Sequence, residues 1–245
     1  MRARFLGVNF ADGIDEEPEF WSSAVPDEFE IGLDFQIGDA DGPASDAFFV
    51  TVTTPKSLCR SRVPRTLVFP GYHQLIVFEY NFDRILRAIG NYVTSCTGET
   101  WEEVVWKVSL LGQYADEGTG YFTREGYLAS LAWASLKDVK VAEREILDRD
   151  VANGQDLFAL TLDLQVEGTP EPTGAWRRSL VCSPAWLQHR HRTDQVIPGW
   201  HRVFALQYEE ERILEELWRL ARTEPGFLGR ASRSLDDPLI EDLAA

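Results

Sequence analysis

The sequence is poor in the residues that most often carry chemistry. Its 245 residues include three cysteines, four histidines and one methionine. Cys59, Cys96 and Cys182 form no C-x-x-C pair and no spacing typical of a metal site. A sparse and odd cysteine count argues against the disulfide framework of a small secreted domain. We therefore expect three reduced thiols in or near the core.

The sequence also lacks a long apolar segment. No run reaches the roughly 18 apolar residues that indicate a transmembrane helix. The first residues, MRARFLGVNFADGIDEE, become acidic before the apolar core of a signal peptide develops. Hydrophobic residues make up 44% of the chain and aromatic residues 12%, which is enough for a substantial core. We expect a globular cytoplasmic protein with no membrane partner.

Basic residues are scarce relative to acidic ones. The chain has 24 Lys and Arg against 40 Asp and Glu, a net charge of −16. Such a field repels nucleic acid and favours basic partners. Acidity also favours solubility, so the charge by itself does not distinguish a basic partner from a soluble surface.

Common catalytic signatures are missing as well. The chain contains no G-x-S-x-G elbow, Walker loop, dinucleotide glycine fingerprint or H-E-x-x-H motif. His189 and His191 could share a metal if they lay on a strand, but QHRHRTD is typical of a loop and has no suitably spaced carboxylate or thiol. We expect no metal site, no cofactor and no catalytic activity. A small-molecule turnover lost in His73→Ala with the fold intact would contradict this expectation.

A repeat is the most informative feature of the chain. The segment GYHQLIVFEYNFDRILRAIGNYV at 71–93 resembles GWHRVFALQYEEERILEELWRLA at 199–221. Seven of the 24 positions from 70 to 93 are identical to those 128 residues later, where composition gives roughly one or two by chance. At a shift of 129, LDFQI and TVTTPKSL align with LDLQV and LVCSPAWL. The spacing predicts two similar domains, residues 1–121 and 122–245.

The sequence pattern predicts strands followed by helices in each unit. RARFLGV, FEIGLDFQIG and AFFVTVTTP have strand patterns, and HQLIVFEY is apolar enough for a central strand. Asn81 is placed to cap a helix, and Thr100 with Glu103 forms a capping box for a second one. The predicted fold class is α+β: two similar units, each a mostly antiparallel sheet with helices packed on one face. The second copy lacks a counterpart of the last helix.

The order of three blocks resembles the immunity protein 8 family of bacterial polymorphic toxin systems. The blocks are FQIGDADGPASDAFFVTVTTPKSL, GYHQLIVFEYNFDRILRAI and GETWEEVVWKVSLLGQYADE, within residues 29–117. The resemblance depends on QIG at 36–38, TP at 54–55, His73 with the strand after it, and the Trp-Glu pair in 98–103.

The resemblance implies a small cytoplasmic α+β protein that binds a cognate toxin domain and blocks its active site or its substrate access. It implies no catalysis by the immunity protein itself. The negative charge favours a basic toxin, such as a nuclease. A stoichiometric inhibitor would be steered onto such a toxin by electrostatic attraction. The toxin would belong to a polymorphic or contact-dependent growth-inhibition system.

Two acidic loops are the candidate toxin contacts. Their residues are Asp12, Asp15, Glu16, Glu17, Glu19, Asp39 and Asp41. The alternative hypothesis for the function is a duplicated non-catalytic interaction module that binds a partner other than a toxin. The salt dependence of the association rate separates the two, because an apolar module would not show it.

Overall fold

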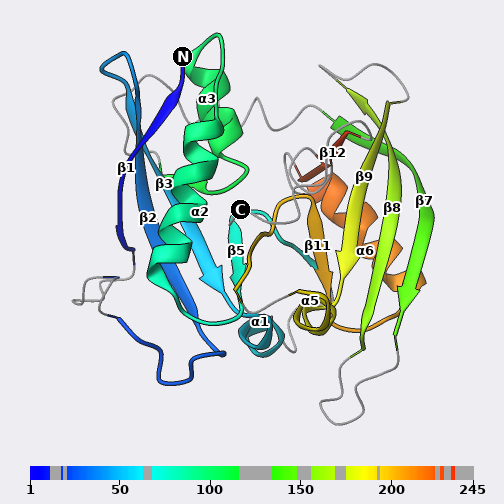
Figure 1. Cartoon of the computed structure of the whole chain (residues 1–245). Helices are drawn as coiled ribbons and strands as arrows, with labels where there is room; N and C mark the ends of the chain where they lie inside the picture. The colour runs from blue at the N-terminus through cyan, green and yellow to red at the C-terminus, as the bar shows by residue number, and fades with distance from the viewer. Residues whose placement is uncertain are drawn as a thin grey trace.

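Two β-sheets stand side by side in the computed structural model of the chain, with helices around them (Figure 1). The structure describes residues 1–11, 18, 21–62, 68–115, 134–147, 156–168, 175–191, 194–223, 227–228 and 233–234. The predicted α+β class is confirmed. No helix within these ranges is long and apolar enough to cross a bilayer.

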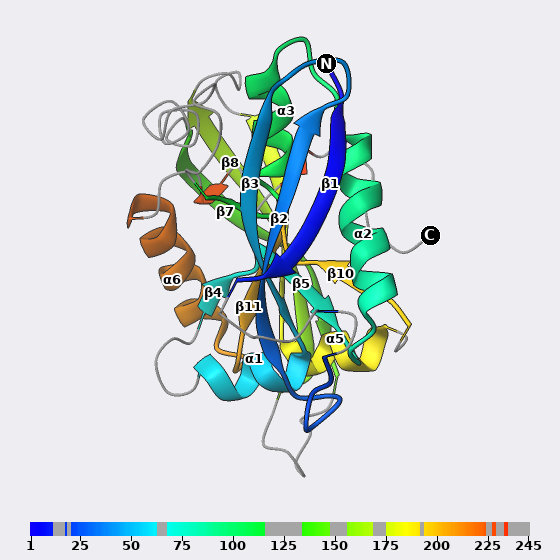
Figure 2. The same ribbon diagram turned by 90° about the vertical axis from the view of Figure 1, so that its left-hand side faces the viewer.

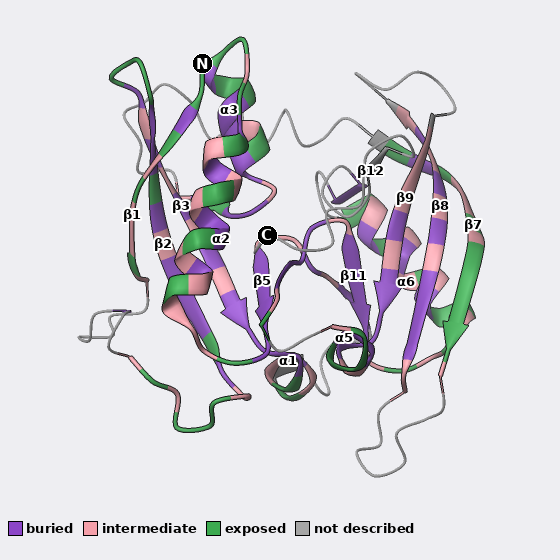
Figure 3. Ribbon diagram, in the orientation of Figure 1, coloured by how far each residue is buried: buried purple, intermediate pink, exposed green. Residues whose placement is uncertain are grey.

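The first sheet has the strand order β1-β2-β3-β5-β10, and β6 also pairs with β3. Most of its pairs are antiparallel, but β3 and β5 run parallel. Its strands are β1 (Ala3–Phe10), β2 (Glu30–Asp39), β3 (Ser45–Thr53), β5 (Gln74–Val77), β6 (Gln113–Tyr114) and β10 (Val196–Pro198). The predicted strands of the first unit are all present, and β5 is buried along its whole length, as expected for a central strand (Figure 3).

The second sheet has the order β4-β11-β9-β8-β7, and β12 also pairs with β9. Here β11 and β9 run parallel and the other pairs are antiparallel. Its strands are β4 (Val68–Pro70), β7 (Ala134–Ile146), β8 (Phe158–Gly168), β9 (Ala175–Cys182), β11 (Arg202–Ala205) and β12 (Arg233–Ser234).

Each sheet takes one short strand from the other half of the chain. Phe69 of β4 pairs with Phe204 of β11, and Ile197 of β10 pairs with Ile76 of β5. Both residues of the second pair differ by 128 from those of the first, so the two exchanges have the same register. The sequence pattern did not predict this exchange. The proposed boundary at residue 121 lies outside the described residues, and the division into two units stays a prediction.

Helices α2 (Phe82–Ser95) and α3 (Trp101–Val108) begin where the capping residues predict. The side chain of Asn81 accepts a hydrogen bond from the N–H of Arg84, and that of Thr100 accepts one from the N–H of Glu103. The carboxylate of Glu103 accepts from the N–H of Glu99 instead of Thr100, so the capping box is displaced by one residue. In the second half, α6 (Glu210–Thr223) packs on the second sheet, and Figure 2 shows α2 and α6 on opposite sides of the molecule.

Two short helices were not predicted: α1 (Pro55–Arg62) and α5 (Pro184–Arg190). No pattern indicated a helix at 55–62, and QHRHRTD, which overlaps the end of α5, is typical of a loop. Both start at a proline that follows a hydroxyl residue, and the hydroxyls of Thr54 and Ser183 accept the N–H of the third residue after them. The Thr-Pro and Ser-Pro pairs therefore indicate the start of a helix, whereas the sequence pattern was interpreted only as the end of a strand.

Three apolar clusters form the core. One lies between the first sheet and helices α2 and α3, and a second lies between the second sheet and α6. The third, with Phe69, Ile76, Ile197 and Phe204, joins the exchanged strands to α1 and α5. Phe227 and Leu228 complete the second cluster, but most residues between α6 and β12 lie outside the described ranges, so the loss of the last helix stays a prediction.

Candidate functional site

The structure places only two of the predicted toxin contacts, Asp39 and Asp41, because Asp12, Asp15, Glu16, Glu17 and Glu19 lie outside the described residues. Asp39 is the last residue of β2, and Asp41 lies in the turn that leads to β3. Asp39 is buried, and its Oδ1 accepts the N–H of Asp41 at 3.3 Å, so its side chain holds the turn. Asp41 is exposed. A toxin contact at these positions stays a prediction.

This turn adjoins the connection between α2 and α3. The N–H of Ala40 donates to the carbonyl of Arg2, and the N–H of Gly98 donates to the carbonyl of Met1. Figure 1 shows the first residue between the turn and α3. Three exposed carboxylates therefore gather at one end of the first sheet, and we call them the acidic end: Asp41, Glu99 and Glu102.

The Trp-Glu motif has a structural explanation. Trp101 Nε1 donates to Asp46 Oδ2 at 2.6 Å, and the Tyr114 hydroxyl donates to Asp46 Oδ1 at 2.9 Å. Burial raises the pKa of Asp46, while these two hydrogen bonds act in the opposite direction. Asp46 was missed in the sequence, although it occupies the buried side of β3 together with Phe48 and Val50, where an apolar residue is expected.

His73 and His201 are the two non-glycine residues of the described chain with positive φ, 60° and 61°. Each directly precedes a central strand, β5 or β11. His73 Nε2 lies 2.9 Å from the carbonyl oxygen of Ser109, which ties the start of β5 to the end of α3. This contact gives His73 a structural role.

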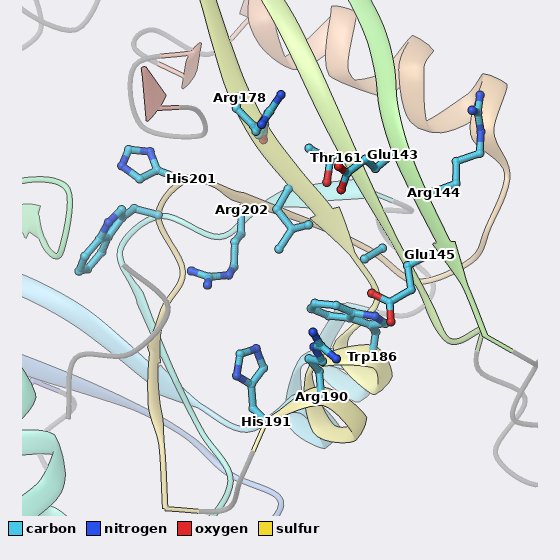
Figure 4. Close-up of a pocket in the computed structure, with 14 residues that line it drawn as sticks. Glu143, Arg144, Glu145, Thr161, Arg178, Trp186, Arg190, His191, His201 and Arg202 are labelled. Carbon is cyan, nitrogen blue, oxygen red and sulfur yellow. The ribbon is translucent and has the colours of Figure 1, made fainter. Parts of the chain in front are cut away.

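A cavity of about 430 Å³ lies on the second sheet (Figure 4). Leu160 and Leu162 of β8 face α6, whereas Ala159 and Thr161 line the cavity, so it lies on the face of the sheet that points away from α6. Helix α5 closes one side, and the connection from β10 to β11 closes another. The residues that define its chemistry are Glu145, Thr161, Trp186, Arg190, His191 and Arg202.

Two of the arginines beside the cavity are engaged elsewhere. Arg178 Nε lies 2.9 Å from Asp163 Oδ1, and Arg144 Nη2 lies 2.7 Å from Glu210 Oε1 on α6. These hydrogen bonds raise the pKa of both guanidinium groups and lower the pKa of Glu210. Figure 4 shows Arg144 pointing away from the cavity.

The inner wall carries hydrogen-bond donors. Arg202 is 6% exposed, and its Nη1 donates to the carbonyl of Pro198 at 2.5 Å. Trp186 is 7% exposed, and its Nε1–H has no hydrogen-bond acceptor within the described part of the protein. Arg190 is exposed at the end of α5, and His191 Nδ1 lies 3.2 Å from Gln195 Oε1. This lining suits an acceptor-rich ligand.

The two histidines of the H-x-H pair lie in different settings. His189 is exposed on α5, whereas His191 caps the end of that helix. Across the described ranges, no three His, Cys, Asp or Glu side chains converge as metal ligands would.

The first half of the chain is similar to a known protein family. Residues 7–117, which are 111 of the 245, match the family described as Immunity protein 8. The resemblance inferred from the sequence is thereby confirmed over this segment, which contains Asp46, His73, Trp101 and the acidic end. The cavity residues lie outside it. No curated protein and no solved structure matches the chain.

Proposed function

Because residues 7–117 match the Immunity protein 8 family, we propose that this protein binds a cognate bacterial toxin domain and neutralises it. The match is the observation that carries the proposal, since the family is one of immunity proteins against polymorphic toxins. We further propose a stoichiometric complex that forms in the cytoplasm and blocks the active site or the substrate path of the toxin without catalysis. The toxin that we propose as the partner of this protein belongs to a polymorphic or contact-dependent growth-inhibition system.

The charge supports a basic toxin. An inhibitor of net charge −16 is attracted to a basic surface over distances of about one Debye length, roughly 8 Å at physiological salt. Enzymes that attack nucleic acid need such surfaces, so a nuclease is the toxin class that the charge favours. The same field keeps the inhibitor itself away from nucleic acid. Electrostatic attraction chiefly raises the association rate.

We place the contact at the acidic end. Asp41, Glu99 and Glu102 are exposed and lie within the matched segment, the first in the β2–β3 turn and the other two around the start of α3. Together they present carboxylates that one basic patch can cover, beside the exposed Arg2 and the N-terminal ammonium of Met1, which donates to the carbonyl of Gly98. Residues 12–19 are a separate candidate contact, because they follow Phe10, which lies at the other end of β1 from the Ala3–Asp39 pair beside this turn.

A protection assay tests the function. The toxin-like domain encoded beside this gene is expressed in cells with and without the protein, and surviving cells are counted. We expect survival only on co-expression, together with recovery of a complex by pull-down. Killing that continues despite co-expression, with no complex, would refute the proposal and favour an interaction module with another partner.

The contact surface is tested by charge reversal. The variant Asp41→Lys/Glu99→Lys/Glu102→Lys should reduce the association rate about tenfold or more at low salt. The matched control, Glu209→Lys/Glu211→Lys/Glu215→Lys, reverses the carboxylate that directly precedes α6 and two within it, and changes the net charge equally. Stopped-flow mixing at several salt concentrations measures both. Equal losses in the two variants would show that net charge acts and that the acidic end has no special role.

A further inference from the structure

The cavity on the second sheet has no part in the proposed toxin contact, and its residues lie outside the segment that matches the family. We propose that this cavity is a binding site for a small organic molecule that carries a carboxylate or phosphate group. The proposal goes beyond the immunity function and does not depend on it. It rests on the donors that converge in the cavity, on the size of the cavity and on the position of the surrounding charges.

The first step concerns Trp186. The residue is 7% exposed, it lines the cavity, and its Nε1–H finds no acceptor among the described residues. A buried N–H group without an acceptor is unfavourable, and native proteins satisfy nearly all such groups. Less than 1 Å² of this nitrogen is exposed, so a small shift of the ring would bring the N–H into contact with a ligand oxygen in the cavity. An indole nitrogen is only a donor, so the group that it selects must be an acceptor.

The second step concerns charge. Arg202 is buried in the wall of the cavity and brings a permanent positive charge there. Figure 4 shows Arg202 and His191 pointing toward one another, with Arg190 and Trp186 beside His191 on α5. A ligand between them would meet cationic donors from β11 and from α5. Charge-assisted hydrogen bonds of this kind favour carboxylate and phosphate oxygens over neutral acceptors.

Four other charged residues line the cavity: two arginines whose charge is balanced by a carboxylate, and two glutamates that oppose an anion only weakly. Arg178 and Arg144 are held by Asp163 and Glu210. Glu143 and Glu145 line the cavity from β7, where both residues are exposed. Water and salt screen exposed charges more than buried ones. The charge of the buried Arg202 is therefore screened less than the charges of Glu143 and Glu145.

The third step concerns size. Small-molecule sites typically enclose about 300–1,000 Å³ and combine apolar walls with a few placed polar groups. The cavity has about 430 Å³, and Ala159, Leu180 and the ring of Trp186 supply apolar surface. These features suit an organic acid with a short apolar body. A carboxylate and a phosphate share the required chemistry, and the experiment distinguishes them.

The test monitors the indole N–H of Trp186 by NMR of the ¹⁵N-labelled full-length protein. Each of the eight tryptophans gives one indole signal, and Trp186→Phe identifies the one that belongs to Trp186. The probes are glutarate and phenyl phosphate at constant ionic strength, with glutaramide as the uncharged control. We expect a saturable downfield shift of the Trp186 signal with at least one acid and none with glutaramide. The acid that binds more tightly identifies the preferred group.

Arginine variants complete the test. Arg202→Gln should weaken binding about tenfold or more, the usual effect of losing one charged hydrogen bond. Because Arg202 is buried, Arg190→Gln provides a second variant at an exposed position that leaves the fold intact, and it should weaken binding about threefold. Arg219→Gln, an exposed arginine on α6, is the matched control and should bind as the wild type does. The absence of a saturable shift with both acids, or wild-type affinity in Arg190→Gln, would overturn the proposal.

Discussion

Gly71 and Gly199 lie against each other where the chain crosses from one sheet to the other. A Cβ atom added to Gly199 would lie 1.8 Å from the carbonyl oxygen of Gly71, and one added to Gly71 would lie 2.5 Å from the carbonyl oxygen of Gly199. The N–H of Gly71 donates to the carbonyl of Arg202, and the N–H of Gly199 donates to the carbonyl of Gln74. No side chain fits at this crossing without moving backbone.

We therefore expect Gly199→Ala to destabilise the protein by about 3 kcal/mol or more, because the backbone must separate and break these hydrogen bonds. Urea denaturation measures the loss. The matched control is Gly7→Ala in β1, since a Cβ there would meet nothing within 4 Å, and its free energy of unfolding should change by less than about 1 kcal/mol. Equal stability of Gly199→Ala and the wild type would contradict the close approach.

The exchange of β4 and β10 predicts that the halves depend on each other. A fragment of residues 1–121 would keep β4 but lose β11, its partner, and β5 would lose β10. Unpaired strand edges of this kind associate with other chains. We expect this fragment to form a homodimer in which each β4 pairs with the β5 of the other copy, and to bind fragment 122–245 when both are expressed together. Light scattering after size-exclusion chromatography measures the mass, and a stable monomer of 1–121 would contradict the prediction.

Local patterns were enough to predict most elements. The alternation in β2 and β3, the apolar stripe of α2 and the caps at Asn81 and Thr100 each depend on a few neighbouring residues, and all are present. The exchange of β4 and β10 depends on which distant strand a three-residue segment pairs with. Hydrophobic pattern sets the register and face of a strand but does not identify the partner of so short a segment.

The sites were harder to predict for a related reason. The cavity combines residues of β7, β8, β9, α5 and β11, which are separated by up to 59 positions between Glu143 and Arg202. Nothing in the spacing of Trp186 and Arg202 marks them as neighbours. The acidic end likewise needs the contact between the chain start and the connection from α2 to α3. Asp46 was predictable in principle, because a carboxylate at a core-facing position of a strand requires donors.

Asp46 predicts a pH dependence of stability. Burial raises its pKa above the ordinary value of 3.8, so on raising the pH the unfolded state loses this proton before the folded state does. The contribution of Asp46 is therefore largest below about pH 4 and is lost as the pH rises through the raised value. Relative to Asp46→Asn, the wild type should lose free energy of unfolding between about pH 3 and pH 7. Urea midpoints of both proteins at each pH measure the difference, and a relative gain for the wild type would mean that the hydrogen bonds from Trp101 and Tyr114 outweigh burial.

The three cysteines should differ sharply in reactivity. Burial raises the pKa of Cys96 to about 11 and that of Cys182 to about 12, whereas Cys59 on α1 is only half-buried. At about pH 8 a thiol of pKa 12 is ionised in only about one molecule in ten thousand, and the thiolate is the reactive form. We expect a disulfide reagent to modify one thiol per native chain quickly and all three after unfolding in urea. Cys59→Ser should abolish the fast reaction and leave the other two unchanged, whereas fast labelling that persists in this variant would show that a buried thiol is open to solvent.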